Sequence, residues 1–260
     1  MTKTENVTDG EIQLSIVLPC YRASTILRIK LPLLLKYLRK LVSAFEVIVV
    51  DDGSEDSGET ARIAQALDCR FFSLPRNTGK GAAVRRGMLA ALGRYRIYTD
   101  ADIPFELSAF DAMLHYLDFK EFHIVAGDRT LPESIYSAKV SIGRHLASDV
   151  CSFIVGRFVA GGWYDTQCGM KGFQGAVAQD LFGVTRIERF AFDVELLYVA
   201  LKRNYDIKRI PVRLVCNDTS SVRLFQDGMM FVRDLARIRW NQLWGRYNRS
   251  LSTQQITGLP

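Results

Sequence analysis

Two aspartates stand one residue apart in the stretch YTDADIPF, which runs from Tyr98 to Phe105. Asp100 and Asp102 follow a β-prone run and precede Pro104, so they are predicted to lie just past the end of a strand. Carboxylates this close repel each other unless a cation lies between them. Hard cations such as Mg²⁺ and Mn²⁺ prefer oxygen ligands, and they often combine one or two protein carboxylates with substrate phosphates. The pair therefore predicts a metal site that would neutralise a diphosphate leaving group.

The elements that must position these carboxylates alternate along the first half of the chain. Apolar, β-branched runs predict strands, and the segments between them have helical spacing. The predicted strands are 12–19, 45–52, 69–75, 94–100 and 122–128, and the predicted helices are 32–42, 57–67, 79–92 and 107–119. Strict alternation indicates the α/β class, with a mainly parallel sheet that helices cover on both faces. In such sheets ligands bind outside the carboxyl ends of the strands.

The predicted strand ends read LPCYR, VDDGSED, LPRNTGKG, TDAD and AGDR. Four of these five ends combine a carboxylate, a lysine or an arginine with glycine or proline. An acid at such a place is often a helix cap, as Asp56 is expected to be for the helix that follows it. Capping does not explain why Asp51 and Asp52 occur together with Asp100 and Asp102. We therefore expect a binding site at this edge of the sheet.

The second half of the chain departs from the alternation. A helix is predicted over 190–203 and a strand over 206–216, and two amphipathic segments stand beside them. Segment 138–160 has an apolar stripe with basic residues beside it, formed by Ile142, Leu146, Val150, Ile154 and Phe158. The last segment has an apolar stripe formed by Phe225, Met229, Val232, Ala236, Trp240, Leu243 and Tyr247, with Arg223, Arg233, Arg237, Arg239 and Arg246 among the remaining positions. Such a stripe ordinarily packs on its own domain, but its Trp and Arg content leaves open a helix in a lipid headgroup layer.

These patterns predict four regions along the chain. They are a flexible N-terminus over 1–11, a catalytic domain over 12–221, an amphipathic membrane-interface helix over 222–248 and a flexible tail over 249–260. A chain of 260 residues, of which 48% are hydrophobic, can bury the core of one large α/β domain.

Composition limits the partners and the compartment. Eleven basic residues stand against four acidic ones between residues 202 and 249, and such an end can face nucleic acid, an acidic membrane surface or solvent. The five cysteines are widely spaced and never form a CxxC pair, which favours a reducing compartment over a disulfide framework or a zinc site. The polar first residues predict no signal peptide. The longest apolar run, 150–163, is shorter than the roughly 20 residues of a membrane span.

Two function classes without a metal and diphosphate site explain less of the sequence. A nicotinamide dehydrogenase would have glycines in the pattern GxGxxG at the first turn, where this chain reads LPCYRAS. A nucleic-acid-binding protein would account for the basic end, but not for DDGS or DAD.

Six motifs in order, LPCYR, VIVVDDGSEDSG, NTGKGAAVRRGM, TDAD, DTQCGMKGF and FAFDVELLY, make the chain resemble the family 2 glycosyltransferases of the GT-A fold. Within them the chain is most similar to the dolichyl-phosphate β-glucosyltransferases and other polyprenyl-phosphate hexosyltransferases. The resemblance covers about residues 12 to 247, and DTQCGMKGF followed by FAFDVELL is its most specific part. It implies a metal-dependent transfer of a hexose from a UDP-sugar to a polyprenyl phosphate such as dolichyl phosphate, with glucose as the first candidate and N-acetylglucosamine or another hexose as alternatives. It also implies a peripheral protein on the cytoplasmic face of a membrane.

The resemblance implies a donor site at the strand ends. Uracil and ribose would lie against Pro19, Tyr21 and Asp52, with Asp52 accepting a hydrogen bond from the base. Further donor contacts are implied for Lys80, Gly81, Asp100, Ala101 and Gln167, and Asp100 with Asp102 would bind Mg²⁺ or Mn²⁺. Two positions depart from the family patterns: Arg22-Ala23 replaces Asn-Glu after the tyrosine, and Pro104 replaces a metal-binding glutamine of a related mannosyltransferase branch.

Cations are also expected on the acceptor side, because a lipid phosphate carries negative charge at the bilayer surface. The candidates are Arg129, Arg144, Ser148 and Lys171. Arg144 and Ser148 lie one helical turn apart, and the mannosyltransferase branch has a similar set. Each cation alone is more often an ordinary surface residue. We hypothesise that these residues converge on one acceptor phosphate.

The expected acceptor decides the expected mechanism. A sugar hydroxyl must lose a proton as it attacks and needs a general base, whereas a phosphate is already anionic at neutral pH. We therefore expect in-line attack by the lipid phosphate with inversion at the anomeric carbon. Asp193 and Glu195 occupy the region where relatives with hydroxyl acceptors keep a base. Asp193 is expected either to position other groups or to cap its helix, or to act as the base if the acceptor is a soluble or glycerolipid hydroxyl.

Overall fold

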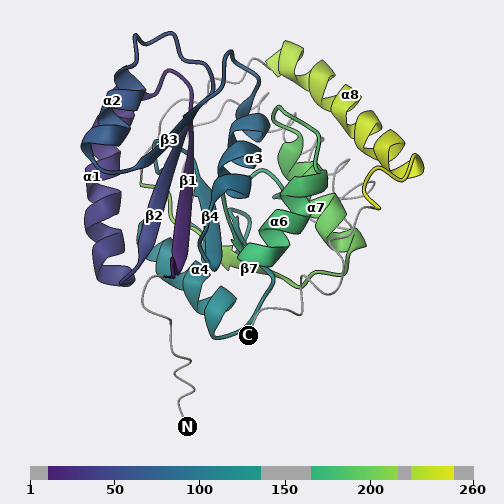
Figure 1. Ribbon diagram of the computed structural model, residues 1–260. Coiled ribbons are helices and arrows are strands. Elements are labelled where there is room, and N and C mark those ends of the chain that lie inside the picture. Colours follow the sequence, from purple (N-terminus) through teal and green to yellow (C-terminus); the bar gives the residue numbers. More distant parts are fainter. Residues whose placement is uncertain (1–10, 136–164, 216–223, 249–260) are drawn as a thin grey trace.

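A seven-stranded sheet forms the centre of the protein, as Figure 1 shows for the computed structural model, which describes residues 11–135, 165–215 and 224–248. The strand order is β3-β2-β1-β4-β6-β5-β7, and of these seven strands only β6 runs antiparallel to its neighbours. The strands are β1 Leu14–Cys20, β2 Phe45–Asp51, β3 Arg70–Ser73, β4 Tyr95–Thr99, β5 Ile124–Asp128, β6 Met170–Gln174 and β7 Ile207–Pro211. The predicted α/β class with a mainly parallel sheet is confirmed.

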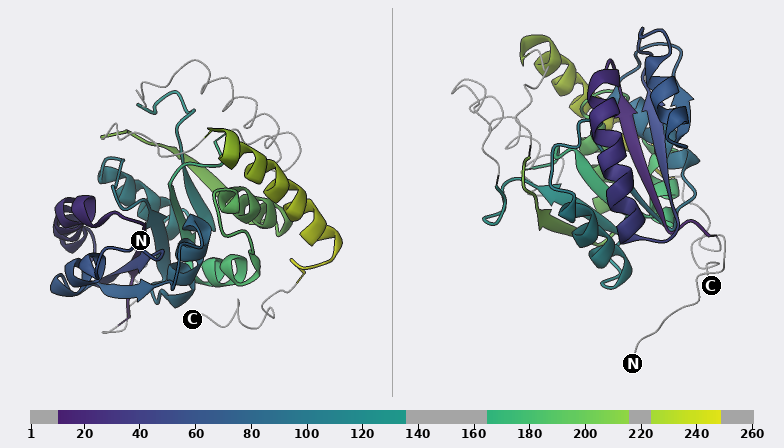
Figure 2. Two further views of the ribbon diagram at one scale, coloured as in Figure 1. Left: turned by 90° about the horizontal axis from the view of Figure 1, so that it is seen from above. Right: turned by 90° about the vertical axis from the view of Figure 1, so that its left-hand side faces the viewer.

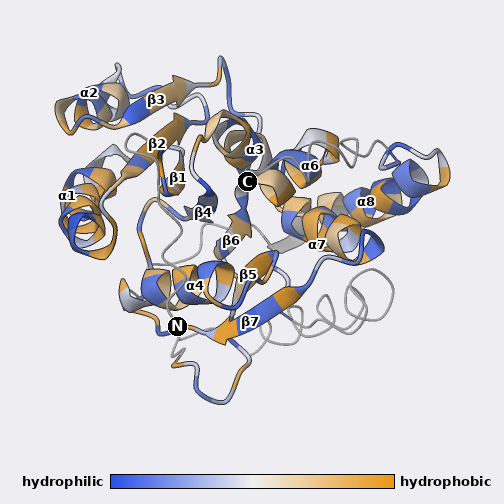
Figure 3. Cartoon of the chain, turned by 60° about the horizontal axis from the view of Figure 1, so that its bottom comes forward, coloured by the Kyte–Doolittle hydropathy of each residue, from blue (hydrophilic) through white to orange (hydrophobic). Residues whose placement is uncertain are grey.

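Helices cover both faces of this sheet (Figure 3). They are α1 Ser24–Leu41, α2 Glu59–Ala66, α3 Lys80–Ala90, α4 Ser108–Asp118, α6 Gly175–Val184, α7 Phe192–Lys202 and α8 Leu224–Leu243. One apolar core lies under α1 and α4, and a second lies under α3, α6 and α7. Alternate residues of a strand enter opposite cores, and β1 illustrates this: Ile16 and Leu18 belong to the first core and Val17 to the second.

The first helix is longer than its sequence predicts. It begins at Ser24 rather than at Pro32, and Pro32 lies inside it on the exposed side. Proline removes one backbone hydrogen bond from a helix interior. The helix continues through this point because Leu27 and Leu31 before the proline, and Leu34 after it, are all fully buried against the sheet.

Two further elements were not predicted, the strand β6 and the helix α6 that follows it directly. The letters of β6, MKGFQ, include a lysine and a glycine, so they lack the apolar run that signals a buried strand. In the structure β6 lies between β4 and β5, and Lys171 is fully buried. The strand is thus held by its two neighbours rather than by its own composition.

The parallel strands β1, β2 and β4 end at the same edge of the sheet. Cys20 pairs with Asp51 at the ends of β1 and β2, and β4 ends at Thr99 immediately before Asp100. Helix α3 begins at this edge with Lys80. The predicted convergence of the strand ends is therefore confirmed, and the two views of Figure 2 show the surrounding helices.

The C-terminal part contains the predicted long helix, α8. The predicted amphipathic segment 138–160, most of the flexible N-terminus 1–11 and the tail 249–260 lie outside the described residues. Among the helices that the structure describes, none is long and apolar enough to cross a membrane.

Candidate active site

The Asp-x-Asp motif lies on a tight turn after β4. The N–H of Ile103 donates a hydrogen bond of 2.9 Å to the carbonyl of Asp100, which closes the turn around Ala101 and Asp102. Ile103 has a φ of +44°, a region that a β-branched residue rarely adopts. Such strained backbone is common where a protein holds functional groups in place.

The cation beside the first aspartate in this structure is Lys80. Its Nζ lies 2.5 Å from Oδ1 of Asp100, and both side chains are partly exposed. Burial lowers the pKa of Lys80, but the negative charges of Asp100 and Asp193 outweigh it, so the pKa lies above its ordinary value. The ammonium group is therefore charged at neutral pH. Lys80 belongs to α3 and Asp100 to the end of β4, so the fold brings together two motifs that lie 20 residues apart.

The residues of this turn fit a hard divalent cation. The Asp100 side chain is 36% exposed, and its other side lies so close to Gly169 that any Cβ there would overlap Oδ2. Within the described part of the chain, no group of three or more His, Cys, Asp or Glu side chains could hold a metal ion. The turn offers the carboxylates of Asp100 and Asp102, and Mg²⁺ or Mn²⁺ can be bound by two carboxylates when phosphates supply further oxygens.

Asp52 organises the loop in front of α3. Its carboxylate accepts hydrogen bonds of 2.8 Å from the N–H groups of Thr78 and Gly79, and it is buried. Burial raises the pKa of Asp52 above its ordinary value, although these two hydrogen bonds oppose the rise. The expected contact of Asp52 with the nucleotide base stays a prediction, and the structure adds a role in fixing the first turn of α3.

Two glycines let a second loop pack against the start of α3. Gly79 has a φ of +122°, and a Cβ there would come within 2.5 Å of the carbonyl oxygen of Glu188. A Cβ at Gly81 would come within 2.6 Å of Cβ of Phe192. The loop before α7 therefore lies directly on the first turn of α3, next to Lys80.

This loop adds one functional candidate that the sequence interpretation missed. Arg189 is exposed, its Cγ lies beside Gly79, and its positive charge is one of the influences that lower the pKa of Asp52. It precedes the FAFDVELL motif, but nothing in its spacing distinguishes it from an ordinary surface cation. Only the packing of its loop on α3 brings it to the predicted donor site.

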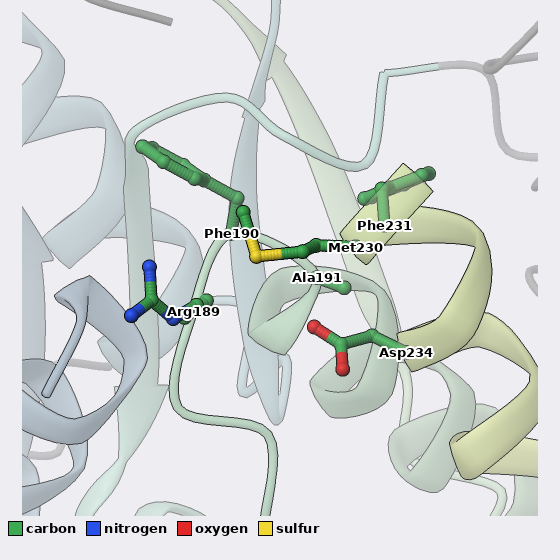
Figure 4. A pocket seen from close by; sticks show the side chains of 6 residues that line it. All are labelled: Arg189, Phe190, Ala191, Met230, Phe231 and Asp234. Atoms are coloured by element: carbon green, nitrogen blue, oxygen red, sulfur yellow. The ribbon is translucent and has the colours of Figure 1, made fainter. Parts of the chain in front are cut away.

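A small pocket lies between the same loop and α8 (Figure 4). Its lining residues are Arg189, Phe190, Ala191, Met230, Phe231 and Asp234. In Figure 4 the Met230 side chain reaches toward Phe190, and the Arg189 guanidinium extends away from Asp234. Burial raises the pKa of Asp234, and the neighbouring arginines oppose that rise. The pocket thus joins the start of α8 to the loop that covers α3.

Asp193 is held by a buried lysine and a tyrosine. Nζ of Lys171 lies 2.6 Å from Oδ1 of Asp193 and also donates to the carbonyl of Cys168 at 2.8 Å. The Tyr98 hydroxyl donates to the same Oδ1, and all three side chains are buried. Burial and the charge of Asp193 raise the pKa of Tyr98 well above its ordinary value, so its hydroxyl keeps its proton.

Two expectations change with this arrangement. The cap position of α7 is Ala191 and no side chain caps it, so Asp193 is not the helix cap. Lys171 was expected to face an acceptor phosphate, but its side chain is 0% exposed and faces Asp193. Sequence spacing could not reveal this, because the antiparallel insertion of β6 decides which way Lys171 points.

Glu195 serves the fold rather than the site. It is fully buried and accepts hydrogen bonds of 2.7 Å from the N–H groups of Arg186 and Ile187, and one of 2.5 Å from the Tyr247 hydroxyl. Burial raises the pKa of Glu195, and these hydrogen bonds oppose the rise. Glu195 thereby ties the residues that follow α8 to the loop before α7.

The other predicted site residues are placed as follows. Tyr21 and Gln167 are exposed, Pro19 is half-buried and Ala101 is buried. Arg129 forms two side-chain hydrogen bonds with Asp165, at 2.9 and 2.7 Å. Arg144 and Ser148 lie outside the described residues. Asp56 accepts hydrogen bonds from the N–H groups of Gly58 and Thr60 at the start of α2, although the cap position itself is Gly58 and not Asp56 as expected.

Known proteins with similar sequences are glycosyltransferases. A family model described as glycosyl transferase family 2 matches residues 15–181. The chain is 33% identical over 261 residues to a dolichyl-phosphate beta-glucosyltransferase of Dictyostelium discoideum, covering 94% of this chain and 79% of that protein. A protein of the same name from Drosophila melanogaster is 32% identical, with 91% of this chain and 76% of that protein covered.

Solved structures with the same fold include two synthases. Mannosyl-3-phosphoglycerate synthase from Rubrobacter xylanophilus matches with a TM-score of 0.67 and 18% identity, covering 96% of this chain and 79% of that chain. Glucosyl-3-phosphoglycerate synthase from Mycobacterium tuberculosis, in complex with Mn²⁺, UDP and glucosyl-3-phosphoglycerate, matches with a TM-score of 0.60 and 17% identity, covering 93% and 82%. At these identities the likeness shows the fold alone, which is the GT-A fold of glycosyltransferases.

Proposed function

This chain belongs to glycosyl transferase family 2, and we propose that it transfers glucose from UDP-glucose to a polyprenyl phosphate such as dolichyl phosphate. The reaction takes place at the cytoplasmic face of a membrane, depends on Mg²⁺ or Mn²⁺ and inverts the anomeric carbon. The names of these two relatives support the acceptor and the sugar. The complex of a structural neighbour with Mn²⁺ and UDP supports the metal and the nucleotide.

The observation that carries the acceptor assignment is the engagement of Asp193. A hydroxyl acceptor needs a carboxylate that can take its proton, within hydrogen-bonding reach. Asp193 is buried, and Lys171 and Tyr98 both donate hydrogen bonds to its Oδ1. A phosphate acceptor needs no base, because its oxygen is already negatively charged. The geometry of Asp193 therefore favours a phosphate over a hydroxyl as the attacking group.

In the proposed reaction an oxygen of the lipid phosphate attacks the anomeric carbon from the side opposite UDP. The bond from that carbon to the β-phosphate oxygen breaks, and UDP leaves with the electron pair. Asp100 and Asp102 would hold the metal ion, which when bound neutralises charge on the departing diphosphate. Lys80 stands beside Asp100 as a second positive group, so it can contact the same diphosphate.

The donor base lies, in this proposal, between Tyr21 and the loop that Asp52 holds. Tyr21 is exposed at the end of β1, and Asp52 follows β2 directly. The hydrogen bonds from Thr78 and Gly79 to Asp52 fix that loop before any ligand binds, so the loop need not be ordered at the moment of binding. On the acceptor side, Arg129 is the predicted phosphate-binding cation that this proposal retains. Asp165 orients its guanidinium.

A transfer assay with a short-chain polyprenyl phosphate, a panel of UDP- and GDP-sugars and Mg²⁺ or Mn²⁺ tests the proposal. We expect one UDP-hexose, UDP-glucose, to give a lipid-linked sugar, and we expect chelation or Asp102→Asn to abolish the product. Asp68→Asn is the matched control, because Asp68 is exposed on a surface turn with a φ of +54°, a conformation that asparagine tolerates.

Other outcomes of this assay separate the parts of the proposal. Slow metal-dependent hydrolysis of the donor without a lipid product would keep the donor site and reject the acceptor. Transfer to a soluble or glycerolipid hydroxyl that Asp193→Asn abolishes would make Asp193 the base. The absence of both turnover and nucleotide binding would reject the transferase proposal itself.

A further inference from the structure

Helix α8 has an inner face that is bound to the domain. Phe231, Asp234, Ile238 and Asn241 are buried, and their spacing of three and four residues puts them on one side of the helix. The Tyr247 hydroxyl, just past the helix, donates a hydrogen bond to the buried Glu195. These contacts fix how α8 is rotated on the domain.

The opposite face is apolar and exposed. We call Val232, Ala236, Trp240, Leu243 and Trp244 the outer face of α8. The exposed fractions of its large side chains are 61% for Val232, 58% for Trp240, 81% for Leu243 and 64% for Trp244. Four residues of the predicted stripe, Val232, Ala236, Trp240 and Leu243, are thus on the helix as expected, but they point away from the domain, whereas Tyr247 is buried against it. Figures 1 and 2 show α8 along the rim of the molecule.

The charges around this outer face have one sign. Arg233, Arg237 and Arg239 are exposed on the helix, whereas Asp234 is buried on the inner face. Arg246, past the end of the helix, is also exposed, but its Nη1 donates a hydrogen bond to Asn241 of the inner face. Among the described side chains from residue 230 to 248, the exposed charged ones are therefore all arginines. A partner that matches both properties must offer negative charge next to an apolar layer.

An anionic lipid surface has this combination. Interfacial helices bury Trp and Leu at the boundary of headgroups and acyl chains, while Arg on the flanks meets anionic headgroups. The ring centroids of Trp240 and Trp244 lie 6.0 Å apart. Tryptophan is one of the residue types enriched at membrane interfaces. A nucleic acid would satisfy the arginines, but it would leave Val232 and Leu243 in water.

We propose that the outer face of α8 docks on an anionic lipid surface. The inference rests on the proposed function. It adds how a protein with a lipid acceptor would bind the membrane surface. The start of α8 shares a pocket with Arg189 and Phe190, in the loop that packs on α3 beside Lys80. Docking through α8 therefore holds the lipid surface near the edge of the sheet that carries Asp100.

Vesicle binding tests this proposal without a turnover assay. The full chain is mixed with phosphatidylcholine vesicles, with or without phosphatidylglycerol, and the bound fraction is measured by co-sedimentation at low and high salt. We expect binding to the anionic vesicles that weakens with salt, and a blue shift of tryptophan fluorescence. The variant Trp240→Ser/Trp244→Ser should bind at least about tenfold more weakly, because the apolar insertion is lost.

Two further variants make the result specific. Arg233→Gln/Arg237→Gln should lose the preference for phosphatidylglycerol. Leu92→Ser/Phe119→Ser is the matched control, because both residues are exposed apolar side chains outside α8, and it should bind as the wild type does. Circular dichroism and urea unfolding of each variant confirm that the fold is intact.

Several outcomes would overturn the proposal. Equal binding of the tryptophan variant and the wild type would show that another surface holds the membrane. Failure of the wild type to bind anionic vesicles, or retention of DNA in preference to vesicles, would reject lipid as the occupant. A dimer in sedimentation analysis that the tryptophan variant abolishes would assign the outer face to a second copy of the chain. The short-chain transfer assay in detergent separates this failure from failure of the proposed function, because it needs no docking.

Discussion

Two ammonium groups stand beside two carboxylates in the candidate active site, and the pairs differ in exposure. Lys80 and Asp100 are both partly exposed, whereas Lys171 and Asp193 are buried. The first pair can exchange partners with a ligand from solution. The second pair can do so only if the core opens, so we expect it to position the site.

The buried pair makes a stability prediction. Lys171→Met leaves the Asp193 carboxylate buried without its cation, and we expect a loss of about 3–5 kcal/mol in the free energy of unfolding. The double variant Lys171→Met/Asp193→Leu should recover most of that loss, since neither buried charge remains. Urea unfolding measures both values.

Arg22→Ala serves as the control for that experiment, because it breaks the exposed pair of Arg22 with Glu55 and should change stability little. An unchanged stability for Lys171→Met, or a double variant as unstable as the single one, would contradict the assigned role of the pair.

The pairing of Asp165 with Arg129 predicts how the stability of the protein depends on pH. Burial alone would raise the pKa of Asp165, but the hydrogen bonds and charge of Arg129 lower it below its ordinary value of 3.8. The folded state thus binds this proton less readily than the unfolded state does. The stabilising contribution is therefore complete above the ordinary pKa and is lost as the pH falls through the lowered one.

The comparison of wild type with Asp165→Asn isolates this carboxylate from the other acids. We expect the difference in free energy of unfolding between the two to shrink as the pH falls from about 7 to about 3. A constant difference over that range would show that the pairing with Arg129 does not carry the effect.

At the scale of elements, glycines decide how closely α3 and its neighbours approach the sheet. A Cβ at Gly87 would overlap Cγ1 of Val17 in β1, whereas a Cβ at Gly183 in α6 meets nothing within 4 Å. We expect Gly87→Ala to destabilise the protein by about 1–3 kcal/mol through overpacking, although alanine favours a helix. Gly183→Ala should stabilise it by about 0.5–1 kcal/mol.

Thermal and urea unfolding of these two variants supply each other's control, because the substitution and the secondary structure are the same. If both variants moved stability in the same direction, helix propensity rather than the contact with β1 would explain the result.

At the scale of the whole molecule, the connection between α8 and the catalytic domain depends on Tyr247. Its hydroxyl donates to the buried Glu195, and Nη2 of Arg203 donates to its carbonyl at 2.8 Å. Tyr247→Phe removes one donor from a buried carboxylate, so we expect a loss of about 1–3 kcal/mol. Hydrogen exchange should rise in α8 first.

Tyr37→Phe is the matched control, because the Tyr37 hydroxyl also donates to a carboxylate, that of Asp111, but on the surface. Urea unfolding should show a small change for this variant. Equal losses for the two tyrosines would mean that the burial of Glu195 does not matter to the attachment of α8.

Local pattern determined much of this protein. Alternating apolar runs predicted the parallel strands β1 to β5, and the polar residues after them predicted the edge where the candidate site lies. The motif order predicted the family that the comparisons show. These features depend on residues close in the chain, which is why they can be read without a structure.

Tertiary structure alone decided which groups meet. Lys80 reaches Asp100, and Lys171 reaches Asp193, across elements whose packing no spacing encodes. In α8 the apolar stripe was visible in the sequence, but its direction was not. Asp234 and Asn241 face the domain, where the Tyr247 hydroxyl and Arg246 satisfy Asn241, and the tryptophans face outward. Polar residues can be buried when partners bind them, so hydrophobicity along the chain could not decide which side of the helix the domain would cover.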